Sequence, residues 1–196
     1  MIKIRTVLIL ILTSLAVAGC NLSSDETPPT SPPGVDNPTA TGGNESTETY
    51  TDMLSGIAFD YPSGWTVSPP PPAEAVAYAI TLASYDFLDP NAPGVGGVPP
   101  GTTKVDVAFA PLGSTVGDVR DQLETDISAG FITLLEEQER TFGDATPGMF
   151  IRGQDTFNTE FTQIIREIGE RVVQITQYGD GNALELIATS MRVVSQ

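Results

Sequence analysis

The sequence predicts one α+β domain over residues 50–196, in which two helices cover the faces of a β-sheet. Several short segments alternate large apolar and polar residues with a period of two, which is typical of strands with one buried face. Two other segments repeat their apolar residues at a spacing of three and four, as amphipathic helices do. Because an amphipathic helix must bury its apolar side, each should cover one face of the sheet.

The strands are clearest at residues 57–61 and 105–109, where every second residue is large and apolar. A further set of candidates follows the same pattern less regularly, namely 75–83, 132–142, 149–154, 161–168 and 172–178. The last two of these segments flank Gly169, which predicts a hairpin.

The first helix is expected over residues 116–128. Thr115 and Asp118 have the spacing of a capping box, and Gly130 stands where a helix of this length should stop. The second helix is expected over residues 182–193, with Asn182 and Glu185 at its start and Arg192 in its last turn.

Two proline- and glycine-rich segments, 69–72 and 89–101, interrupt the pattern as long loops. Loops of this length in a compact domain are either functional or merely mobile, and the sequence leaves both readings open.

The first twenty residues follow the layout of a secretory signal. Lys3 and Arg5 precede an apolar run over residues 7–18, which is too short for a stable membrane-spanning helix of roughly 20 residues. The run ends in Val-Ala-Gly19-Cys20, which resembles the bacterial lipobox. This resemblance implies cleavage between Gly19 and Cys20 and a diacylglyceryl thioether on the Cys20 sulfur.

Cys20 is the sole cysteine, so the chain can form no internal disulfide, which agrees with lipidation. Lipid on this residue would hold the protein at the extracytoplasmic face of a cell membrane, with inner and outer membrane left open. Two acyl chains satisfy the requirement of two signals for stable anchoring. Residues 20–49 would then form a disordered acidic tether rich in Ser, Thr, Pro and Gly, whose mean reach is roughly 30 Å.

Charge and composition exclude several functions. The chain has 25 acidic and 9 basic residues, a net charge of −16, and no histidine. Phosphate repulsion therefore excludes nucleic acid as a partner. Without histidine or a free thiol, the chain can build neither a Ser-His-Asp nor a Cys-His arrangement, and zinc sites of the usual kind are excluded. We expect no enzyme activity, no cofactor and no metal.

Two polar clusters have both a functional and a structural interpretation. Asp86, Asp89 and Asn91 could hold a weakly bound calcium ion, but their spacing is not that of an EF-hand, and Asp89-Pro90 favours a type I turn. The second cluster consists of Glu136, Glu137 and Glu139. We interpret it as a solvated strand edge that discourages pairing with another strand.

The segment 56–67, Gly-Ile-Ala-Phe-Asp-Tyr-Pro-Ser-Gly-Trp-Thr-Val, resembles the opening of PsbP-like domains, in which a strand ends in Tyr-Pro and Gly-Trp precedes the next strand. This resemblance implies an α/β/α sandwich around a mostly antiparallel sheet over residues 50–196. It also implies protein docking rather than catalysis. Trp65 is expected to pack in the core, with a partner-binding role as the alternative.

The sequence thus predicts a lipid-anchored extracytoplasmic module that docks on or assembles with another protein, of unknown identity. One alternative is a lipoprotein that binds a small molecule and uses residues 89–101 as a lid. A more remote alternative is a hydrolase with a carboxylate pair, although nothing distinguishes any two of the acids.

Overall fold

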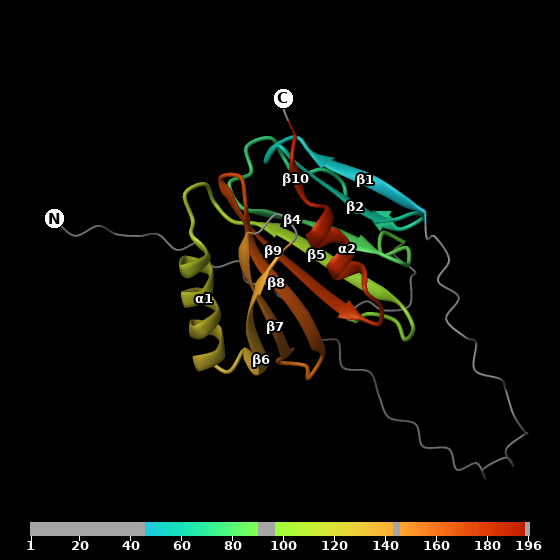
Figure 1. The fold of residues 1–196 in the computed structure, drawn as a ribbon. Helices are drawn as coiled ribbons and strands as arrows, with labels where there is room; N and C mark the ends of the chain where they lie inside the picture. Colours follow the sequence, from blue (N-terminus) through green and yellow to red (C-terminus); the bar gives the residue numbers. More distant parts are fainter. Residues whose placement is uncertain (1–45, 90–96, 143–145, 195–196) are drawn as a thin grey trace, which may run out of the picture. The chain divides into compact units, whose positions relative to one another are not determined.

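The computed structural model describes residues 46–89, 97–142 and 146–194. Figure 1 shows the arrangement of the elements. Their order is β1 (Thr47–Asp52), β2 (Ile57–Pro62), β3 (Thr66–Val67), β4 (Tyr78–Ala83), β5 (Thr103–Phe109), α1 (Val116–Ser128), β6 (Ile132–Thr141), β7 (Pro147–Asp155), β8 (Glu160–Ile168), β9 (Arg171–Gly179), α2 (Ala183–Ser190) and β10 (Arg192–Val193).

The strands form two sheets, and every pairing in them is antiparallel. The larger sheet has the order β3-β4-β5-β9-β8-β7-β6, and the smaller has the order β1-β2-β10. With two helices beside antiparallel sheets, the fold class is α+β, as the sequence predicted. The hairpin around Gly169 is also confirmed, because β8 and β9 pair on either side of it.

The two helices cover opposite faces of the larger sheet. Ile165 packs in one cluster with Leu123 of α1, whereas its neighbour Ile164 packs in the other cluster with Ile187 of α2. Successive side chains of a strand point to opposite faces, so the helices must lie on opposite sides. The smaller sheet shares the α2 face, since Phe59 of β2 belongs to the same cluster as Ile187.

Helix α1 has the ends that the sequence predicted. The Thr115 hydroxyl accepts from the Asp118 backbone N–H at 3.1 Å, and the Asp118 carboxylate accepts from the Thr115 N–H at 2.9 Å, which completes the capping box. Gly130 has a φ of +77°, the left-handed conformation in which glycine commonly follows a helix. Both signals are local, so the sequence alone reveals them.

Helix α2 differs from the prediction at both ends. It stops at Ser190 instead of continuing to residue 193, because Arg192 and Val193 pair with Ala58 and Ile57 of β2 as strand β10. Asn182 is the N-cap residue, but its side chain makes no capping hydrogen bond. Asn182 thus stands at the start of the helix, as the sequence predicted, but its side chain does not cap the helix.

The domain also begins earlier than its composition indicates. Strand β1 starts at Thr47, inside the segment expected to be tether, and its first residues are exposed. Strand β4 starts at Tyr78 rather than at residue 75. Within the described ranges, no helix is long and apolar enough to span a membrane.

Candidate functional site

Part of the predicted sites lies outside the described residues. This applies to Gly19 and Cys20, to most of the tether, and to Asn91 of the calcium hypothesis. Residues 90–96 of the loop expected to act as a lid are outside as well. Lipidation and the lid therefore stay predictions.

The described part of the calcium hypothesis is a turn. The Asp86 Oδ1 atom accepts from the backbone N–H groups of Leu88, at 3.0 Å, and of Asp89, at 3.2 Å. This is the local bonding by which Asp stabilises a turn. Among the described residues, no group of three or more acidic or cysteine side chains could hold a metal ion.

The glutamates of the second cluster lie on β6, the edge strand of the larger sheet. Glu136 lies 3.5 Å from Arg152, and Glu137 lies 3.1 Å from Arg120 of α1. Strand β6 also changes register between Leu134 and Glu136. Charged side chains and an irregular register both discourage another strand from pairing with this edge.

The basic side chains of the described domain bind acids and carbonyl groups of the same domain. Five of them form ion pairs with acids, and these are Lys104, Arg120, Arg140, Arg152 and Arg192. Arg166 and Arg171 are buried and donate to the backbone carbonyls of Ala188 and Ala110, at 2.5 and 3.0 Å. The excess of acids therefore sets the sign of the surface potential.

A polar row crosses the face of the larger sheet on the α1 side. Asp106 of β5 accepts from Thr81 of β4 at 2.6 Å and from Lys104 at 2.8 Å. The Lys104 ammonium lies 5.6 Å from the centre of the Tyr178 ring on β9. Burial, and then the charges of Asp106 and Asp155, raise the pKa of Tyr178 to about 12. The ammonium and the carboxylate of this row are therefore paired with each other.

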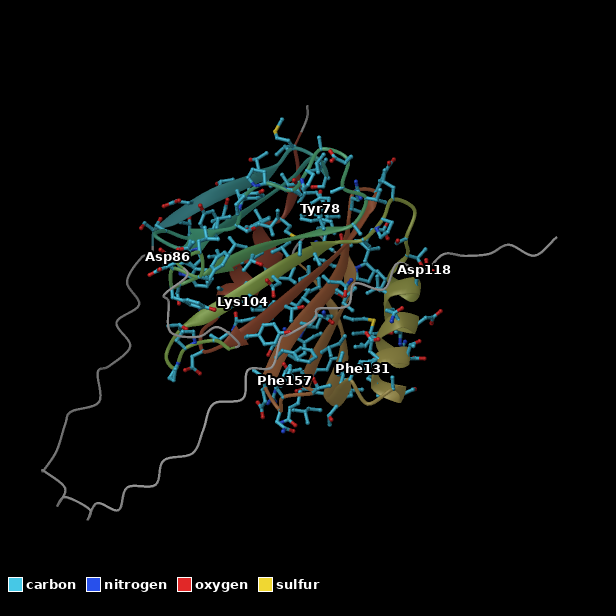
Figure 2. All side chains as sticks on the ribbon, turned by 180° about the vertical axis from the view of Figure 1, so that it is seen from behind. Tyr78, Asp86, Lys104, Asp118, Phe131 and Phe157 are labelled. Carbon is cyan, nitrogen blue, oxygen red and sulfur yellow. The ribbon has the colours of Figure 1, made fainter. Side chains whose placement is uncertain are left out.

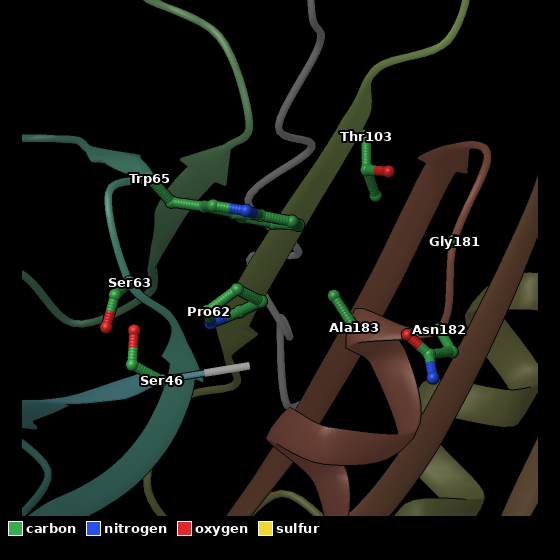
Figure 3. A pocket seen from close by; sticks show the side chains of 8 residues that line it. All are labelled: Ser46, Pro62, Ser63, Trp65, Thr103, Gly181, Asn182 and Ala183. Atoms are coloured by element: carbon green, nitrogen blue, oxygen red, sulfur yellow. The ribbon is translucent and has the colours of Figure 1, made fainter. Parts of the chain in front are cut away.

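Trp65 lines an open pocket of about 400 Å³ between the β2–β3 turn and the start of α2. Figure 3 shows the indole ring above Pro62, with Thr103 and Ala183 across the pocket. Trp65 is half-buried and packs partly against the main core. The expected packing in the core is therefore confirmed in part, and the partner-binding alternative stays a prediction.

The turn that carries Trp65 is held by β1. The Glu48 carboxylate accepts from the Tyr61 hydroxyl at 2.9 Å and from the Gly64 N–H at 3.4 Å. The Ser63 N–H donates to the Ser46 carbonyl at 2.9 Å. Gly64 has a φ of +79°, which only glycine adopts readily. Strand β1, absent from the sequence prediction, thus orients the aromatic residue that the sequence singled out.

The other wall of the pocket is the start of α2. Gln177 of β9 accepts from the Leu184 N–H at 2.9 Å and donates to the Gly181 carbonyl at 2.8 Å. It therefore performs the capping that was expected of Asn182. Asn182 is exposed and lines the pocket with its side chain.

A second hollow, of about 370 Å³, lies where several turns meet. Its apolar wall consists of Leu54, Leu112, Ile168 and Val193, which we call the apolar groove. Leu112 is 66% exposed and Val193 is 61% exposed. The groove combines the β1–β2 turn, the loop after β5, the end of β8 and strand β10.

A buried carboxylate fixes one side of the apolar groove. Asp52, only 2% exposed, accepts from the Ser55 N–H at 2.9 Å, from the Leu54 N–H at 3.4 Å and from the Tyr78 hydroxyl. Burial and the bond to Asp52 raise the pKa of Tyr78 well above its usual range. Asp52 thereby ties the turn that carries Leu54 to the larger sheet.

Two further exposed aromatic residues, Phe131 and Phe157, lie away from the groove. Figure 2 shows them at the opposite end of the molecule from Tyr78. Phe157 is 69% exposed, which makes it a matched reference for Leu112 in experiments.

No protein-family model matches the sequence, and no curated protein matches it either. In shape, the chain is similar to the solution structure of cyanobacterial PsbP (CyanoP) from Synechocystis sp. PCC 6803. The TM-score is 0.47, the sequence identity is 14%, and the match covers 79% of this chain and 97% of that one. That protein belongs to the family that the segment 56–67 resembles.

Proposed function

We propose that this protein is a lipid-anchored, non-catalytic docking module that binds another protein through the apolar groove. The observation that carries the proposal is the grouping of exposed apolar side chains in one hollow. Single exposed apolar residues are normal, but contiguous ones mark interaction sites. Leu112 and Val193 come from segments far apart in the sequence and line the same hollow with the half-buried Leu54.

The rigidity of the groove supports docking. Val193 is held in β10 by pairing with Ile57, and the Val194 N–H donates to the Gly56 carbonyl at 2.8 Å. The Asp52 carboxylate fixes the turn that carries Leu54. A surface that is ordered before binding loses less conformational entropy when a partner docks.

The charge of the chain indicates the chemistry of the partner. The net charge is −16, and the basic side chains of the described domain are already engaged by its own acids and carbonyls. A partner with an apolar projection and a cationic rim therefore fits best. Long-range attraction would accelerate association, so the association rate should fall as salt increases.

The proposed lipid anchor would restrict docking to the membrane surface. Lipid on Cys20 would concentrate the domain at the membrane, and a tether with a mean reach of roughly 30 Å would let it search for a partner there. Replacing Cys20 with Ala should abolish incorporation of labelled fatty acid. Normal labelling of the C20A chain would contradict the anchor.

Partner capture from native membranes tests the docking proposal. The full-length chain, the L112D variant and the F157D variant are each recovered after mild crosslinking, and their co-purifying proteins are compared. We expect a discrete partner with the wild-type and F157D chains and at least a tenfold loss with L112D, because a carboxylate placed in the groove would have to be desolvated. Equal recovery with all three chains would contradict docking through the groove.

A further inference from the structure

We propose that the Trp65 pocket is a binding site for a neutral saccharide, separate from the apolar groove. The pocket has an aromatic wall, an uncharged lining and polar side chains that are available for hydrogen bonding. Together these features fit a pyranose ring better than other classes of ligand.

The aromatic wall is Trp65. Its ring is half-buried, so it is fixed by the core on one part and open to the pocket on the other. The π-face of an indole is negative, and it attracts the slightly positive C–H groups that line one face of a pyranose. A flat, rigid apolar surface of this kind binds a sugar face without adding a charge.

Among the residues that the structure describes, none that lines the pocket is charged. An ionic ligand would have to leave water without a counter-charge, which is costly. An anion would in addition meet the negative potential of a chain with a net charge of −16. The composition of the pocket therefore favours a neutral ligand over phosphates, carboxylates and amines.

Asn182 provides the specific polar contact. Asn at an N-cap normally bonds its own helix, but here Gln177 takes that role and the Asn182 amide makes no capping bond. Within the described residues, no side-chain hydrogen bond of Asn182, Ser46 or Ser63 is formed. An amide that both donates and accepts can bind two adjacent hydroxyl groups of a sugar.

The size of the pocket agrees with a small saccharide. Its volume of about 400 Å³ lies near the lower end of the roughly 300–1,000 Å³ that is usual for small-molecule sites. The described part of the expected lid, residues 97–101, does not contribute to the lining.

Intrinsic fluorescence tests this inference directly, because Trp65 is the sole tryptophan. The full-length chain is titrated with maltose, cellobiose and N-acetylglucosamine in a detergent without a sugar headgroup. Vesicles that contain a glucosylated lipid form a second arm. We expect a saturable change with at least one probe. Saturation by soluble sugar indicates a free or polymeric glycan, and saturation by vesicles alone indicates a lipid-borne sugar.

Two variants separate specific binding from a general effect. N182A should weaken binding about five- to tenfold, the loss expected for one net hydrogen bond, without changing the melting temperature. Q122A removes an exposed amide on α1 and should bind as the wild type does. No saturable change up to about 50 mM in either arm, well above a 1 mM Kd, would overturn the site. Unchanged affinity of N182A would overturn it equally.

Discussion

Removing the Asp52 carboxylate should destabilise the protein far more than removing an exposed acid. In D52A, the Ser55 and Leu54 amides and the Tyr78 hydroxyl all lose their acceptor in a site that is 2% exposed. A hydrogen bond to a charged group contributes about 1.5–3 kcal/mol. The Leu54 contact is long at 3.4 Å, so two strong bonds remain. Their loss amounts to about 3 kcal/mol at the lower end of that range.

The companion variant Y78F should cost about 1.5 kcal/mol, because it removes one of these bonds and leaves the two amides paired. Urea unfolding of the full-length chain at neutral pH, followed by circular dichroism, gives both values. The exposed acid Asp121 of α1 supplies the control, and D121A should change the free energy of unfolding by less than about 0.5 kcal/mol.

The double variant D52A/Y78F tests whether the two groups act together. Because both changes remove the same bond, their costs should fall short of additivity by about 1 kcal/mol or more. If D52A costs no more than D121A, or if the costs of D52A and Y78F add, the proposed role of Asp52 is wrong. In either case the carboxylate would not hold the turn that carries Leu54, and the apolar groove would lose the argument for its rigidity.

Three more predictions follow from single features of the fold. In thermal unfolding, G179A should lose at least about 1–2 kcal/mol more stability than G64A. Both glycines have a φ of +79°, but only at Gly179 would a Cβ collide with the Thr102 carbonyl oxygen. Equal losses of stability in the two variants would contradict this. T115A should lose about 1 kcal/mol through its capping box, measured by urea unfolding, and no loss would show that the cap is not stabilising. Because the pKa of Tyr178 rises from 10 to about 12 on folding, its contribution to stability should be fully present below pH 10 and should be lost as the pH rises towards 12. The Y178F variant should therefore lose less stability at alkaline pH than the wild type. An identical loss in both chains would refute the assignment.

Much of the sheet and the first helix could be predicted because their signals are local. The alternation around Phe59 and Val107, and the cap at Thr115, depend on residues close together in the chain. Strand β1 was missed because its residues are mostly polar and exposed, so its pairing with β2 leaves little trace in the pattern.

The end of α2 was missed for a related reason. The helical repeat of apolar residues continues to Met191, but the pairing of Arg192 and Val193 with β2 ends the helix at Ser190, and that partner strand is remote in the sequence. The apolar groove depends on this strand and on Leu112, which lies in a loop between Pro111 and Gly113. No sequence period brings these residues together, so only the fold reveals the groove.

The sequence indicated the aromatic residue of the Trp65 pocket but not the pocket itself. The Tyr-Pro and Gly-Trp stretch marked the aromatic residue, and Gly64 marked the turn. The opposite wall was not predictable, because the sequence makes Asn182 a helix cap, whereas Gln177 takes that role from a neighbouring strand. A hydrogen bond from the preceding strand thus replaces the capping bond that Asn182 would make.

Site-specific photocrosslinking in native membranes tests the central proposal most directly. A photoreactive residue is placed at position 112, which is 66% exposed, or at position 157, which is 69% exposed and remote from the groove. Docking through the apolar groove predicts one discrete crosslinked partner from position 112 and none from position 157, with a yield that falls as salt increases. A uniform smear from both positions, or the same partner from both, would contradict it.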